Sequence, residues 1–184
     1  MNGTTMTGNG GTRRHRLRPF VWGGAACLLL LPALAMRFHP QSGVDWSAVD
    51  FAAMGVLLAA VCGLYEFGAR LGGSPAYRAG FGIAVLAGFL TVWANLAVGM
   101  LGSEGNPANL MFVLVLGIAA LGSLLARFRA AGMAKAMFAA ALAQLAAVGI
   151  ATAIGGFAGR ELALTACFAM PWLLAGALFR YAAR

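Results

Sequence analysis

Charged residues are scarce in this chain. Of its 184 residues, 13 are basic and 5 are acidic, which makes 10% charged, whereas a soluble domain has about 25%. The hydrophobic fraction is 61%, above the roughly 45–50% of globular domains. This composition excludes an ordinary soluble domain, although the length alone would suit one.

Cysteine and histidine are also rare. Cys27, Cys62 and Cys167 all lie in apolar stretches, where a thiol behaves as a small hydrophobic group. Their spacing matches neither a metal site nor a disulfide framework, and His39 has no ligand partner at a suitable spacing. No catalytic or nucleotide-binding motif stands out, so we expect no cofactor and no metal.

The chain does contain six long uncharged stretches, of 18, 15, 25, 22, 24 and 18 residues. A helix that crosses the hydrocarbon core of a bilayer needs about 20 residues. Five stretches are long enough alone, and the shortest becomes so with its flanks. The sequence therefore predicts an all-α, polytopic transmembrane helical bundle, with spans at about 20–36, 48–69, 79–101, 107–126, 133–154 and 161–179.

The N-terminal region has two interpretations. Residues 1–12 offer almost nothing to bury, and a basic cluster follows, which predicts a disordered basic tail over 1–19 and a six-helix domain over 20–180. Alternatively, the charged stretch, the apolar run and Ala33-Leu34-Ala35 resemble a secretory signal that is cleaved after residue 35. We favour a retained first span.

Several residues mark helix ends. Ser47-x-x-Asp50 has the form of a capping box. Asn106 is a good N-cap, with Pro107 at the first helical position. Pro171 lies within the last span, where we expect a kink.

The basic residues are distributed asymmetrically. With six spans and the N-terminus inside, the inner segments 1–19, 70–78, 127–135 and 180–184 hold eleven basic residues, and the outer loops hold only Arg37 and Arg160. This asymmetry predicts that both termini are cytoplasmic. It also explains the net charge of +8 without a nucleic-acid partner.

Three polar residues within the spans are candidates for an intramembrane site: Glu66, Asn95 and Gln144. Glu66 could be a functional carboxylate, but Arg70 follows four residues later on the same helix face and favours a structural pair. For Thr91, Asn95 and Gln144 we favour hydrogen bonds between helices over a substrate path.

The outer face is richer in polar groups. Asp50, Glu104, Asn106 and Asn109 form the candidate site there, because carboxylates can bind cations or transfer protons. Capping competes for Asp50 and Asn106. We favour Glu104 and Asn109 slightly over other outer pairs, since an acid flanked by glycine beside a helix N-terminus can lie close to exposed backbone amides.

Several segments resemble a family of small bacterial multi-pass membrane proteins whose members carry an NLAVGxxGxExNPAN-type stretch. The segments are DWSAVDF (45–51), GLYE (63–66), AYRAG (76–80), VWANLAVGMLGSEGNPANLM (92–111) and ARFRAAGMAKA (126–136). The resemblance covers roughly residues 20–180. It implies a six-span bacterial inner-membrane protein with a retained first span, and it implies no mechanism.

Three functions are compatible with these features. We favour a non-enzymatic membrane component or accessory subunit in a bacterial cytoplasmic membrane, with the lipid bilayer and other membrane proteins, or further copies of the chain, as partners. The alternative is a small transporter or ion-coupled permease that uses Glu66, Asn95 and Gln144. A membrane-embedded enzyme that uses the outer carboxylates comes third.

The predicted orientation can be tested with reporter fusions. Fusions after Arg70, Arg129 and Arg184 should report a cytoplasmic position, and fusions after Val44 and Gly105 an external one, because the loops carry basic residues so unequally. A cytoplasmic signal at Gly105 would contradict the six-span topology. An intact-mass measurement separately shows whether residues 1–35 are removed.

Overall fold

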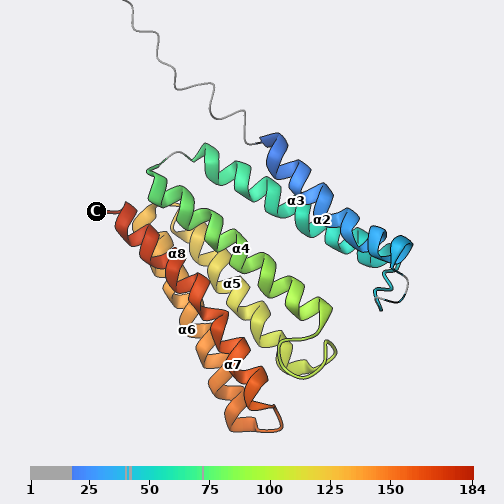
Figure 1. The fold of residues 1–184 in the computed structure, drawn as a ribbon. Coiled ribbons are helices and arrows are strands. Elements are labelled where there is room, and N and C mark those ends of the chain that lie inside the picture. Colours follow the sequence, from blue (N-terminus) through green and yellow to red (C-terminus); the bar gives the residue numbers. More distant parts are fainter. Residues whose placement is uncertain (1–17, 40, 42, 72) are drawn as a thin grey trace, which may run out of the picture. The chain divides into compact units, whose positions relative to one another are not determined.

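The computed structural model describes residues 18–39, 41, 43–71 and 73–184. Residues 1–17 of the predicted tail lie outside the described part, whereas Arg18 and Pro19 already belong to the first helix. All regular structure in the described residues is helical, without a strand (Figure 1). The all-α prediction is confirmed.

Within the described residues, six helical segments are long and apolar enough to cross a membrane, which is the pattern of a multi-pass membrane protein. The bounds of the elements are α2 Arg18–Phe38, α3 Ala48–Arg70, α4 Pro75–Ala97, the short 3₁₀ turn η2 Pro107–Asn109, α5 Leu110–Leu125, α6 Ala130–Ile154, α7 Gly159–Cys167 and α8 Ala169–Ala182. η2 leads into α5, and α7 and α8 together form the last span.

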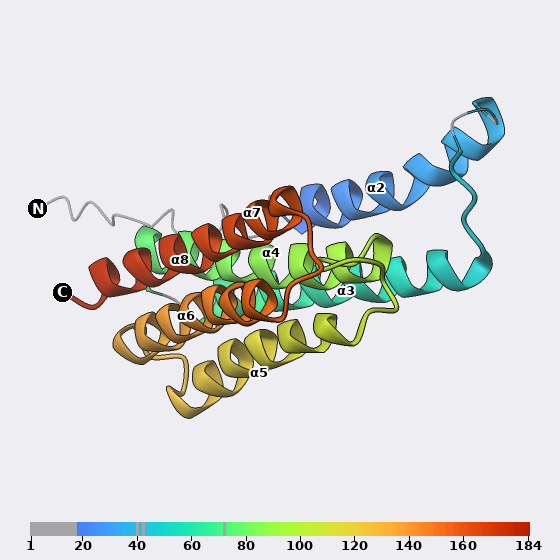
Figure 2. The ribbon, with the colours of Figure 1, turned by 90° about the horizontal axis from the view of Figure 1, so that it is seen from below.

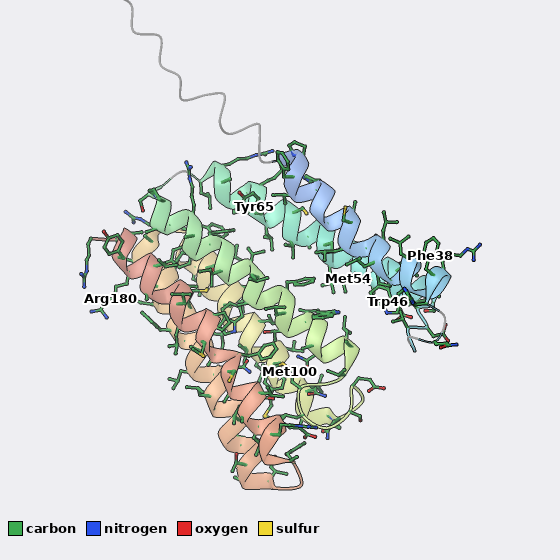
Figure 3. The ribbon with its side chains drawn as sticks, viewed as in Figure 1. Phe38, Trp46, Met54, Tyr65, Met100 and Arg180 are labelled. Carbon is green, nitrogen blue, oxygen red and sulfur yellow. The ribbon has the colours of Figure 1, made fainter. Side chains whose placement is uncertain are left out.

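The chain divides into two compact units, and the boundary in the sequence falls between Glu66 and Phe67, within α3. The first unit contains α2 and most of α3. Trp22 Nε1 on α2 donates a hydrogen bond to Glu66 Oε1 on α3, at 2.9 Å. Trp46 and Tyr65 lie toward opposite ends of α3 (Figure 3).

The second unit is a bundle of four spans in which α4 packs against α8, α8 against α6, and α6 against α5 (Figure 2). Small residues bring these helices close together. A Cβ on Gly122 of α5 would lie 2.7 Å from Ala136 Cβ of α6, and one on Gly176 of α8 would lie 2.9 Å from the Phe138 ring of α6. A larger residue would clash with the backbone-bound Ala136 Cβ at the first contact and displace the Phe138 ring at the second, as expected for helices that associate in lipid by close packing.

The third predicted span, 79–101, is displaced in the structure. Helix α4 begins earlier, at Pro75, because Ser74 Oγ accepts a hydrogen bond from Tyr77 N and Pro75 suits the first turn. The helix also ends earlier, at Ala97, because Gly99 takes a φ of +74°, which ends a right-handed helix. Residues 98–106 therefore form a loop rather than the end of a helix.

The last span contains the distortion predicted at Pro171. It takes the form of an interruption at Phe168, which separates α7 from α8. Proline lacks a backbone N–H, and its ring clashes with the carbonyl four residues earlier. The turn tightens there, with Phe168 N bonded to the Thr165 carbonyl at 3.2 Å.

Candidate functional site

Asn109 holds the loop that follows α4. Its Oδ1 accepts hydrogen bonds from Met100 N at 3.1 Å and Leu101 N at 2.9 Å, and its Nδ2 donates to the Ser103 carbonyl at 2.8 Å. Asn109, Met100 and Leu101 are all buried. The Asn109 side chain thus bonds to backbone groups of the loop that have no partner within a helix. Its role is therefore structural.

The same loop is fastened to the last span. Thr165 Oγ1 of α7 donates to the Met100 carbonyl at 2.7 Å. Gln144 Nε2 of α6 donates to the Thr165 carbonyl at 2.9 Å, which confirms the predicted hydrogen bond between helices. Asn109, Met100, Thr165 and Gln144 therefore form one buried chain of hydrogen bonds, called here the loop network.

Two glycines give the loop its shape. Gly99 and Gly102 have φ values of +74° and +69°, a conformation that side chains rarely adopt. A Cβ on Gly99 would also lie 2.5 Å from the Ser103 backbone. The glycines of this segment are thus needed for backbone conformation and close approach.

Asn106 and Glu104 differ in what they do. Asn106 Oδ1 accepts from Ala108 N at 2.9 Å, with Pro107 at the first position of η2, which confirms the predicted cap. Glu104 is exposed. Asn106 and Asn109 thus stabilise the loop itself, whereas the Glu104 side chain is exposed.

Asp50 forms the predicted capping box in the first unit. Its Oδ2 accepts from both N and Oγ of Ser47 at 2.7 Å, and Asp50 N bonds to Ser47 Oγ at 3.3 Å. The Trp46 and Phe51 rings pack edge to face, with centroids 5.2 Å apart. An aromatic residue just before the cap that packs on the fourth helical residue is a hydrophobic staple, which the sequence analysis missed although both residues flank the box.

Glu66 has a partner that the sequence did not suggest, namely the Trp22 indole described above. Its pairing with Arg70 stays a prediction. Glu66 belongs to the first unit, whereas Asn95 and Gln144 belong to the second. The three predicted intramembrane residues therefore belong to two different units.

For Thr91 and Asn95 the expectation of bonds between helices was wrong, since in the described part of the chain both side chains bond within α4. Thr91 Oγ1 donates to the Ala87 carbonyl at 2.8 Å and Asn95 Nδ2 to the Thr91 carbonyl at 2.7 Å, both within α4. Bonding to the carbonyl four residues back satisfies a polar side chain without help from a neighbour. Among the described residues, three buried side-chain atoms have no hydrogen-bond partner: Asn95 Oδ1, Gln144 Oε1 and Trp172 Nε1.

Tyr77 is a further residue that sequence reasoning missed. It is buried, and its Oη donates to the Phe128 carbonyl at 2.7 Å. Arg127 and Phe128 have φ values of +49° and +57°, which costs about 1–2 kcal/mol per residue without glycine. The tyrosine stabilises this strained connection between α5 and α6. The sequence has no typical turn residue at this connection that could have indicated its conformation.

No protein-family model, curated protein or solved structure matches the chain. The resemblance to a bacterial membrane-protein family therefore stays a prediction. Among the described residues, no three His, Cys, Asp or Glu side chains are placed to share a metal ion.

We predict that Asn109→Ala destabilises the protein by about 2–5 kcal/mol, because it leaves buried backbone groups unsatisfied at about 1–3 kcal/mol each. Asn106→Ala should cost about 0.5–2 kcal/mol through the lost cap. Glu104→Gln should stay within about 0.5 kcal/mol, as expected for an exposed side chain. Thermal unfolding in mild detergent measures all three, and an Asn109→Ala protein as stable as wild type would contradict the structural role.

Proposed function

We propose that this protein is a non-enzymatic component or accessory subunit of a bacterial cytoplasmic membrane, with six spans and both termini inside. It acts through contacts between its helices and those of a partner. The observation that carries the proposal is the use made of its polar side chains. Asp50, Asn106, Asn109 and Gln144 all bind the chain's own backbone.

The outward face of α6 supports contact with another helix. Ala146, Gly149 and Ala153 are exposed there at helical spacing, and a Cβ on Gly149 would meet nothing within 4 Å. Two small residues four apart, such as Gly149 and Ala153, allow a second helix to approach closely in lipid. This face is therefore the proposed contact surface, with another membrane protein or a second copy as the partner.

One observation favours a small transporter as the second candidate. In the second unit, the unpartnered atoms of Asn95, Gln144 and Trp172 occur together with the interruption of the last span at Phe168. Broken helices with free polar groups hold substrates and ions in many transporters. The enzyme hypothesis needs a free Asp50 carboxylate, and Asp50 Oδ2 is already bonded to Ser47 in the capping box.

We predict that Gly149→Leu lowers the fraction of the protein found in larger complexes, because the leucine side chain keeps a partner helix at a distance. Cross-linking in cells followed by native gel electrophoresis measures this fraction. Gly82→Leu is the matched control, since Gly82 of α4 also has open space around its Cβ position. Equal complex formation by wild type and Gly149→Leu would contradict the proposed contact face.

A further inference from the structure

Six basic side chains gather at one end of the second unit. At this end the first turn of α4 contacts the end of α8. The rings of Tyr77 and Phe179 pack edge to face there, with centroids 5.2 Å apart. The hydrogen bond from Tyr77 to Phe128 brings the α5–α6 connection to the same end. The six residues, all exposed, are Arg78, Arg127, Arg129, Lys135, Arg180 and Arg184.

No acidic side chain of the second unit balances these charges. Its two acids are Glu104, in the loop after α4, and Glu161, in the first turn of α7. Met100, in the same loop as Glu104, and Arg180 lie toward opposite ends of the unit (Figure 3). The six basic side chains therefore give this end of the second unit a net positive charge that attracts an anionic partner.

Arg127 and Arg129 are presented by a backbone that is held in place. Phe128 N bonds to the Ser123 carbonyl at 3.1 Å and Arg127 N to the Leu124 carbonyl at 2.8 Å, the pattern of a Schellman helix end. The Phe128 ring packs edge to face on Phe67, with centroids 5.0 Å apart. Because this backbone is already ordered, less conformational entropy is lost when a ligand binds to the arginines.

The surroundings of these residues indicate which anion binds. A guanidinium group matches the geometry of phosphate oxygens and can bind two at once. Leu124 and Leu125, just before this connection, are 58% and 85% exposed, so apolar surface adjoins the arginines. A phospholipid offers both a phosphate and acyl chains, whereas free phosphate offers only the first.

We propose that this basic end binds anionic phospholipid as a retained lipid, with the headgroup phosphate on Arg127 and Arg129 and the acyl chains along the end of α5. The proposal rests on the proposed placement of this end at the cytoplasmic surface of the membrane. Basic clusters at that surface attract anionic headgroups. It does not depend on the contact face at Gly149, so the two proposals can fail separately.

The experiment is native mass spectrometry of the full chain, delipidated in mild detergent and titrated with phosphatidylglycerol or with phosphatidylcholine of the same acyl chains. Phosphatidylglycerol should bind more tightly. Arg127→Gln together with Arg129→Gln should weaken its binding about thirtyfold, since each basic residue near an anionic surface contributes about a factor of five. Arg160→Gln, at the other end of the unit, should leave binding unchanged.

Three further measurements complete the test. Thermal unfolding without lipid shows whether the double variant is folded; if it is not, Lys135→Gln with Arg184→Gln replaces it, with weaker binding again expected. The lysine version, Arg127→Lys with Arg129→Lys, keeps the charge but loses the two-oxygen contact, so it should bind more tightly than the glutamine version and less tightly than wild type. Inorganic phosphate at matched ionic strength should fail to displace the lipid. Equal binding of the two lipids, unchanged binding by the folded glutamine variants, or full displacement by phosphate would overturn the proposal.

Discussion

Within hydrocarbon, a backbone N–H or C=O group cannot bond to water, so it must find its partner inside the protein. Helices meet this requirement by themselves. The loop after α4 does not, because Met100 and Leu101 are buried but no longer helical. The side chains of Asn109 and Thr165 supply the missing partners, and Gln144 anchors Thr165 in turn. The end of the second unit that carries this loop depends on these bonds.

The number and type of the helices could be predicted from the sequence, because uncharged length alone decides whether a helix can cross a bilayer. Caps at Ser47 and Asn106 could also be predicted, since their partners lie two or three residues away. The role of Asn109 could not, because it depends on a loop folding back over eight or nine residues. Thr165 bonds to a residue 65 positions away, which no local pattern indicates.

The two ends of the second unit differ in how their polar groups are used. At the end that holds Asn109, most candidate side chains bind the chain's own backbone, which argues for a structural use of polarity there. At the other end, Tyr77 binds Phe128 and fixes a strained connection, while the neighbouring arginines stay exposed. The exposed charge of the second unit is thus concentrated at the basic end.

The central claim is that the polar residues of the loop network hold the loop to the bundle as one unit. A double-mutant cycle on Asn109→Ala and Thr165→Val tests it most directly, because both side chains bind the backbone of Met100. Unfolding free energies in detergent should show that the double variant loses less than the two single losses together, with a coupling of about 0.5–3 kcal/mol. Losses that add to within about 0.3–0.5 kcal/mol would contradict the account.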